Sequence, residues 1–225
     1  MPLNNKILKI AIDGPAGAGK STVARAVSGR LGLTYLDTGA MYRAITLKIA
    51  REKIDLADLE AIGDLLDRTT INLDHENRVF LDDEEVTEEI RLAQVNDLVS
   101  PVSCISSVRR RLVAMQQAIA DESRGIVMEG RDIASRVMPD ADYKFYLDAS
   151  VQERARRRTR EQLAKGINLS ENEVAAEIRK RDKIDSQRED SPLTIVEDAV
   201  IIDTTGMTFD EVVEFIVNTV KAGLR

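Results

Sequence analysis

Short apolar runs alternate along this chain with longer stretches in which apolar residues recur every three or four positions. The runs cover residues 7–12, 34–36, 126–128, 144–147 and 200–202, and they predict buried β-strands. The longer stretches predict helices over 20–31, 40–51, 56–67, 105–121, from Ser170 to about 183 and from Thr208 to Gly223. Strands that alternate with helices predict an α/β fold built on a doubly wound, five-stranded parallel sheet.

The segment 69–90 departs from this alternation. Residues 70–73 and 78–81 each carry a short strand pattern, and the residues between them are typical of a turn. We therefore predict a hairpin, and with it a small antiparallel sheet inserted into the parallel architecture. His75, the only histidine, is expected to be a solvated turn residue, and the acidic run 82–89 an exposed edge of the insert.

Composition narrows the class of protein. The 225 residues include 32 Lys and Arg against 39 Asp and Glu, which gives a formal charge of −7 and argues against a nucleic-acid partner. No apolar stretch reaches the roughly 20 residues that cross a bilayer. The single cysteine, Cys104, excludes an internal disulfide and a cysteine-cluster metal site. We expect one cytoplasmic, monomeric domain that binds neither nucleic acid nor membrane.

The decisive motif follows the first predicted strand. Residues 14–21 match G-x-x-x-x-G-K-[ST] in full and open a predicted helix. Glycines allow backbone N–H groups to surround a β-phosphate, and the helix N-terminus favours negative charge. Lys20 would bridge the β- and γ-phosphates, and the Ser21 hydroxyl would ligate Mg²⁺. We predict that ATP is bound by Gly14, Pro15, Ala16, Gly17, Ala18, Gly19, Lys20, Ser21 and Thr22.

Later arginines suggest a second anionic ligand. Arg43, Arg131, Arg181 and Arg188 fall in or near loops that follow predicted strands or helices, and such loops meet at the carboxyl edge of a parallel sheet. Arginine binds phosphate through bidentate, charge-assisted hydrogen bonds. Each arginine taken singly is also typical of a solvated surface charge. A GTPase would need a downstream N/T-K-x-D motif, which is absent, so the pattern favours a small-molecule kinase.

Four strings together resemble the bacterial cytidylate kinases. They are residues 12–21, Leu36-Asp37-Thr38-Gly39-Ala40-Met41-Tyr42-Arg43, Glu129-Gly130-Arg131-Asp132, and Arg181-Asp182 through Arg188. They occur in the family's order, cover nearly the whole chain, and differ from adenylate kinases outside the phosphate loop. The predicted hairpin resembles an extension that marks this family. One departure is Ala134-Ser135-Arg136-Val137, where the family usually has Gly-Thr-Val-Val.

The resemblance implies a reaction, ATP + CMP or dCMP giving ADP + CDP or dCDP. It implies a P-loop nucleoside monophosphate kinase core over 1–37, 110–150 and 190–225, a monophosphate-binding region over 38–109 and a helical lid over 151–189. The implied CMP-binding residues are Thr38, Tyr42, Arg43, Ser100, Arg109, Arg131, Asp132, Arg181, Asp185 and Arg188. The implied catalytic residues are Lys20, Arg131, Arg154, Arg157, Arg158, Arg181 and Arg188.

Several points stay open at the level of sequence. Either Glu129 or Asp13 could be the acidic partner of Mg²⁺, and the loop 203–206 resembles the one that packs near adenine. A phosphate acceptor is already largely dianionic near pH 7, so no general base is required. The alternatives are a P-loop kinase for another acceptor, such as UMP or a non-nucleotide metabolite, and a non-catalytic ATP-binding regulatory protein.

Overall fold

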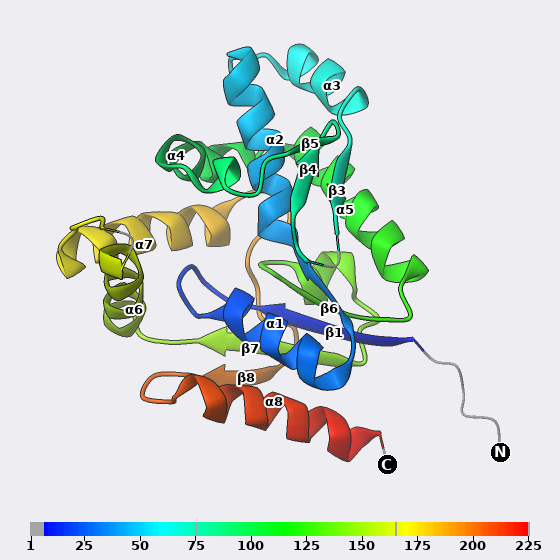
Figure 1. Cartoon of the computed structure of the whole chain (residues 1–225), viewed down its shortest axis with the longest axis vertical. Coiled ribbons are helices and arrows are strands. Elements are labelled where there is room, and N and C mark those ends of the chain that lie inside the picture. The colour runs from blue at the N-terminus through cyan, green and yellow to red at the C-terminus, as the bar shows by residue number, and fades with distance from the viewer. Residues whose placement is uncertain (1–6, 75, 165, 225) are drawn as a thin grey trace.

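The computed structural model describes residues 7–74, 76–164 and 166–224, and its centre is a parallel sheet of five strands. The strands are β1 (Leu8–Asp13), β2 (Thr34–Asp37), β6 (Gly125–Gly130), β7 (Tyr143–Asp148) and β8 (Val200–Asp203), in the order β2-β6-β1-β7-β8. All four pairings are parallel. The predicted five-stranded parallel sheet is confirmed, and its strands all point to the same edge (Figure 1).

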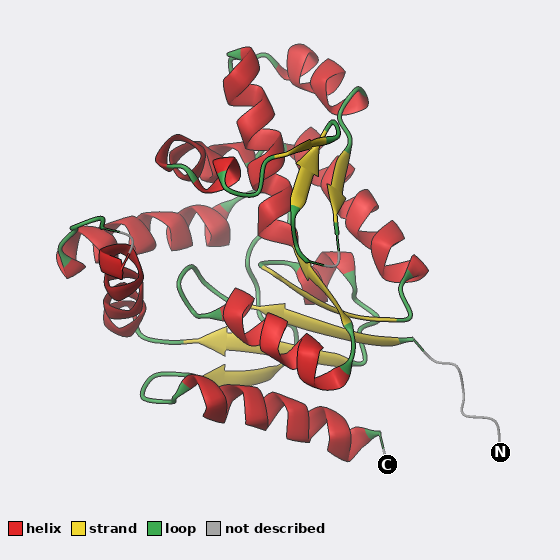
Figure 2. Ribbon diagram, viewed as in Figure 1, coloured by secondary structure: helices red, strands yellow, loops and turns green. Residues whose placement is uncertain are grey.

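Helices cover both faces of this sheet, as the doubly wound prediction requires (Figure 2). On one face, α1 (Lys20–Leu31) and α8 (Phe209–Gly223) bury valines and isoleucines against β1, β7 and β8. On the other face, α2 (Thr38–Glu52) and α5 (Ser106–Glu122) pack with α3 (Leu59–Asp67) and α4 (Ala93–Val102). The sequence pattern did not predict α4, a ten-residue helix that contains Pro101.

The inserted sheet has three antiparallel strands in the order β3-β4-β5. The predicted hairpin is confirmed as β3 (Ile71–Leu73) and β4 (Val79–Leu81), whereas β5 (Glu84–Glu85) was not predicted. Ion pairs connect the acidic run 82–89 to α2: Lys48 pairs with Asp82, and Arg51 pairs with Glu84 and Glu89. The interpretation of His75 concerns a position outside the described residues.

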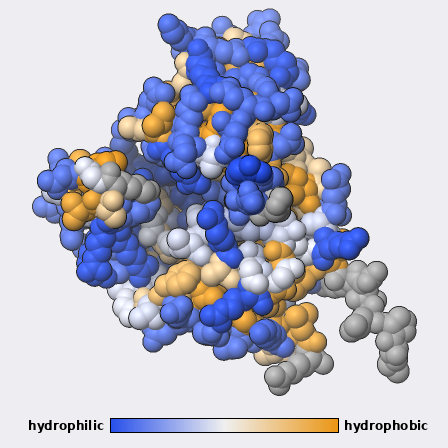
Figure 3. Space-filling model, in the orientation of Figure 1, coloured by the Kyte–Doolittle hydropathy of each residue, from blue (hydrophilic) through white to orange (hydrophobic). Residues whose placement is uncertain are grey.

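Two helices stand at the carboxyl edge of the large sheet, on the side to which the strand arrows point in Figure 1. They are α6 (Val151–Ala164) and α7 (Glu171–Gln187), which pack on each other through Ala155, Val174, Ala175 and Ile178. Capping boxes open α7 at Ser170 and α8 at Thr208. Hydrophilic residues cover most of the face in Figure 3. No helix in the described ranges is long and apolar enough to cross a membrane.

Candidate active site

The phosphate loop joins β1 to α1 at the carboxyl edge of the sheet. Gly17 and Gly19 have φ angles of +78° and +84°, a region that glycine enters without steric cost. At the start of α1, the buried Lys20 donates from Nζ to the carbonyl oxygen of Pro15 at 2.8 Å. Burial and the nearby Arg131 lower the pKa of Lys20 to about 7, and Glu129 opposes that shift. The predicted context, in which a strand leads into the phosphate loop and the loop into a helix, is therefore confirmed.

Two buried carboxylates lie beside this loop and make different contacts. Asp13 accepts hydrogen bonds from the backbone N–H groups of Ile133 and Ala134 at 2.9 and 2.8 Å. Glu129 instead accepts from the Ser21 hydroxyl at 2.6 Å. Burial, reinforced by Asp37, raises the pKa of Glu129, so a cation beside it would stabilise its charge. Hydroxyl and carboxylate oxygens suit Mg²⁺, and Ser21 with Glu129 is the pair whose position fits that ion.

Across from the loop, the carboxylate of Asp185 lies close to three arginines. Asp185 on α7 accepts from Arg131 Nε at 2.8 Å and lies 4.0 Å from Arg181 and 3.9 Å from Arg188. Burial alone would raise the pKa of Asp185, but Arg131 and Arg181 lower it. Burial and the neighbouring Arg131 and Arg43 lower the pKa of Arg181 to about 9. Positive charge is therefore in excess, which favours binding of an anion.

A second cluster lies deeper, around Asp132. Its carboxylate pairs with the buried Arg109 and lies 3.5 Å from Arg188. The Arg109 guanidinium stacks 5.4 Å above the ring of Tyr42, whose buried hydroxyl has no hydrogen-bond partner among the described residues. Arg188 Nη2 is likewise buried without a hydrogen bond to any described residue. The Tyr42 hydroxyl, and Arg188 Nη2 beside its ion pair with Asp132, are therefore placed to hydrogen-bond the edge of a polar ring.

The remaining predicted residues of the second site come from two helices. Thr38 and Arg43 lie on α2, where the Thr38 hydroxyl donates to the Glu129 carbonyl at 2.7 Å and Arg43 Nε donates to Asn96 at 3.4 Å. Burial lowers the pKa of Arg43, and Asp37 opposes that shift. Ser100 lies on α4, a helix that contacts α7. The fold therefore brings all these segments to one edge of the sheet.

The three predicted lid arginines of α6 make different contacts. Arg154 is buried and donates to the carbonyl oxygens of Ala149 and Ala16 at 2.9 and 2.8 Å. Arg157 is held by Glu153 and donates to the hydroxyl and carbonyl of Thr204 at 3.0 and 2.6 Å. Arg158 has no carboxylate partner in the described ranges, and its charge contributes to the lowered pKa of Arg181. Of the three, Arg158 is available to a ligand.

Residues 10–222 match the family model for cytidylate kinase. The chain belongs to the cytidylate kinase family. It is 54% identical over 221 residues to the cytidylate kinase of Caldanaerobacter subterraneus, with 98% of each chain covered. It is 51% identical to that of Pelotomaculum thermopropionicum, with 98% of this chain and 99% of the relative covered. These matches confirm the family and make the chain a nucleoside monophosphate kinase.

Solved structures agree on the fold. An uncharacterized protein from Eubacterium ventriosum superposes with a TM-score of 0.54 at 12% identity, over 96% of this chain and 99% of the other. A protein from Thermus thermophilus superposes with a TM-score of 0.50 at 21% identity, over 97% and 98%. At such identities the likeness concerns the α/β architecture alone.

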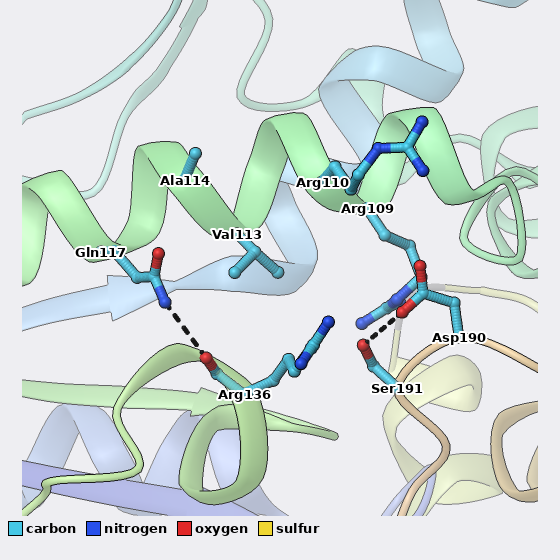
Figure 4. Close-up of a pocket in the computed structure, with 8 residues that line it drawn as sticks. All are labelled: Arg109, Arg110, Val113, Ala114, Gln117, Arg136, Asp190 and Ser191. Carbon is cyan, nitrogen blue, oxygen red and sulfur yellow. Dashed lines mark hydrogen bonds between the residues drawn. The ribbon is translucent and has the colours of Figure 1, made fainter.

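The family departure at 134–137 lies beside the cluster around Asp132 and Arg109. These residues belong to η2 (Ile133–Val137), a single π turn whose first amides are bound by Asp13. A cavity of about 240 Å³ separates η2 from α5 and the segment after α7, and Arg136 extends into it (Figure 4). Gln117 donates to the Arg136 carbonyl at 3.2 Å. Of the changed residues, Arg136 lines this cavity together with Arg109.

Sequence motifs had given no role to several residues that position the site. Asp182 accepts from the backbone N–H of Ala16 at 3.1 Å, and Glu153 holds Arg157. The Ser191 carbonyl accepts from Arg188 Nε at 2.6 Å, and Asn96 accepts from Arg43. Asp182 stood inside the quoted 181–188 string, so its position was a usable signal. Asn96 had none, because it lies on the unpredicted helix α4.

Proposed function

We propose that this chain transfers the γ-phosphate of ATP to CMP or dCMP in a magnesium-dependent, in-line step that gives ADP and CDP or dCDP. The observation that carries the proposal is the excess of buried positive charge facing the phosphate loop. Asp185 accepts from Arg131 at 2.8 Å and lies 4.0 Å from Arg181. Lys20 and Arg43 add two further cations, and Asp37 and Glu129 are further carboxylates that act on this group. Such a site is suited to two phosphate-bearing ligands at once.

The donor would bind on the loop 14–22. Backbone N–H groups and the α1 N-terminus would receive the phosphates, and Lys20 would exchange the Pro15 carbonyl for a phosphate oxygen. Ser21 and Glu129 would hold Mg²⁺, which neutralises phosphate charge when bound. Asp13 has its carboxylate committed to η2, which favours Glu129 over Asp13 for this role.

The acceptor would bind between the two arginine clusters. Arg43, Arg131 and Arg181 are assigned to its phosphate, together with Thr38. Arg109, Asp132 and Arg188, with Ser100 and Tyr42, are assigned to the cytosine ring. The Tyr42 hydroxyl, Arg109 Nε and Arg188 Nη2 are buried without a hydrogen bond to a described residue, and such groups suit a polar ring edge. Asp185 would accept from the sugar hydroxyls while it keeps Arg131 oriented.

Transfer would need positioning and charge neutralisation rather than a base. The acceptor phosphate is already anionic, and Arg158 would supply positive charge from the region 151–189 when that lid closes over 38–109 and the core. Arg157 would act indirectly, by holding the loop 203–206 near adenine through Thr204. Closure would exclude water and strengthen every charge contact.

The test is ADP release with Mg·ATP against CMP, dCMP, UMP, AMP, GMP and no acceptor, with Lys20→Met as the inactive control. We expect strong release with CMP and dCMP, and detection of CDP and dCDP. Equal activity with UMP would leave a kinase but remove the cytosine assignments of Ser100, Arg109 and Asp132. ADP release that ignores the acceptor would overturn the proposal and leave an ATP-binding protein or ATPase.

We also propose that the enzyme is cytoplasmic and monomeric, and that its partners are the two nucleotides alone. The single cysteine supports a reducing compartment. Size-exclusion chromatography with light scattering at micromolar concentration tests the monomer, for which a mass near 25.0 kDa is expected.

A further inference from the structure

The phosphate loop is held from outside by two charged residues of different helices. Arg154 of α6 and Asp182 of α7 form an ion pair at 2.7 Å. The same two side chains hydrogen-bond both polar backbone groups of Ala16. The Ala16 N–H donates to Asp182 at 3.1 Å, and the Ala16 carbonyl accepts from Arg154 at 2.8 Å. Arg154 also donates to the Ala149 carbonyl, where β7 leads into α6.

Gly17, the residue after Ala16, packs closely against α6 and α7. A Cβ placed on Gly17 would lie 3.3 Å from the Cβ of Arg154 and 3.6 Å from Ile178 of α7. Ile178 is itself buried in the contact between α6 and α7. The tip of the loop therefore lies directly against both helices, and a side chain at Gly17 would crowd Arg154 and adopt a strained positive φ.

The charges of the pair balance each other. A lone carboxylate at this place would repel an incoming triphosphate, because it touches the loop that cradles the phosphates. Arg154 removes that cost by pairing with Asp182, and it is almost completely buried in doing so. Its guanidinium is shared among two carbonyls and one carboxylate. This use differs from that of Arg158, which has no carboxylate partner among the described residues.

We propose that Arg154 and Asp182 are positioning residues, a neutral clamp that fixes the Ala16 segment of the phosphate loop and couples it to α6 and α7. The conformation of the loop and the orientation of the two helices are then set together. Arg158, which lies one turn after Arg154 on α6, reaches the phosphates only when that orientation is correct. The inference rests on the proposed ATP-dependent transfer and reassigns Arg154 from phosphate contact to loop positioning.

The test compares Asp182→Ala, Asp182→Asn, Arg154→Ala and the Arg154→Ala/Asp182→Ala double variant with wild type. Asn keeps an oxygen for the Ala16 N–H but loses the ion pair, so it separates the two contacts. The matched control is Arg156→Ala, which removes an arginine of the same helix whose ion-pair partner among the described residues is Glu153. Steady-state kinetics varies ATP and CMP separately, and thermal melting checks that each variant is folded.

We expect the alanine variants to lose about tenfold to a hundredfold in kcat and to raise KM for ATP, with KM for CMP within about twofold of wild type. The double variant should lose no more than the worse single variant, because the two residues act as a unit. Uncoupling should also raise the ratio of acceptor-independent ATP hydrolysis to transfer. Arg156→Ala should match wild type.

Other outcomes overturn the clamp. If Asp182→Ala binds ATP more tightly, the carboxylate competes with phosphate instead of positioning the loop. If the variants only melt earlier, with unchanged KM for ATP and unchanged kcat per folded molecule, the pair is merely structural. If additive losses appear in the double variant, the two residues act separately. Asp182→Asn serves the same comparisons if Asp182→Ala does not fold, and failure of wild type to phosphorylate CMP would instead overturn the proposed function.

Discussion

Replacing Asp185 by alanine tests the electrostatic design of the site. Its carboxylate lies within 4.0 Å of three guanidinium groups and is almost fully buried. Removing one partner of a buried ion pair typically costs about 3–5 kcal/mol, because the remaining charge loses its compensation. The arginines face a ligand cleft, so we expect the lower end, about 3 kcal/mol, which corresponds to a midpoint lower by about 6–12 °C for a chain of this size.

The assay is thermal unfolding and urea unfolding, both followed by circular dichroism, at constant ionic strength in sodium chloride and in sodium phosphate. Phosphate should stabilise Asp185→Ala more than wild type, because an anion can take the place of the missing carboxylate. Asp198→Ala, which removes an exposed partner of Lys144, is the control and should unfold close to wild type. KM for CMP should rise in Asp185→Ala.

The pH dependence gives a second check with a defined sign. The pKa of Asp185 is lowered in the folded protein, so its contribution to stability is present above the unfolded value of 3.8 and is lost as pH falls through the folded pKa. The difference between wild type and Asp185→Ala should shrink in strong acid. A variant as stable as wild type, with no preferential gain from phosphate, would refute the assignment of Asp185 as the common counter-charge.

Three further changes probe other parts of the molecule. Arg158→Ala should lower kcat by about a hundredfold while KM for ATP changes little, since Arg158 is assigned to the transition state; unchanged turnover would exclude it. Burial raises the pKa of Asp13 to about 6, so the contribution of Asp13 to folding stability is present below pH 3.8 and is lost as the pH rises through 6. Between these pH values the free energy of unfolding of wild type should therefore fall by about 3 kcal/mol on account of Asp13. Urea unfolding at several pH values should show that this decrease is absent in Asp13→Asn. Gly17→Ala should weaken ATP binding in calorimetric titrations, because φ is +78° and Arg154 is too close.

Local sequence patterns were sufficient to predict those features whose structure depends on residues close together in the chain. The apolar runs placed all five strands of the parallel sheet. The central strands β1 and β6 are apolar because both of their faces are buried, whereas the edge strand β8 keeps Val200 and Ile201 exposed. The boxes Ser170–Glu173 and Thr208–Glu211 marked two helix starts for the same local reason. The P-loop string named the donor site, since its chemistry is carried by consecutive residues.

Other features depended on contacts between distant segments. The sequence pattern did not predict α4, because Pro101 and a short apolar pattern hide a helix that is stabilised by α2 and α7. The strand β5 has two glutamates, and ion pairs with Arg51 hold that segment in place. In both cases the stabilising partner lies far away in the chain.

For the candidate site, too, some features could be predicted from the sequence and others depended on tertiary contacts. Motifs alone named the arginines and identified the family, but they treated Arg154, Arg157 and Arg158 as equivalent and left Asp13 and Glu129 equal. Tertiary structure separated them: Arg154 contacts Ala16, Arg157 contacts Thr204, and Asp13 contacts η2. A charged side chain acquires its role from the partners that folding brings within hydrogen-bond distance, and those partners lie more than forty residues away.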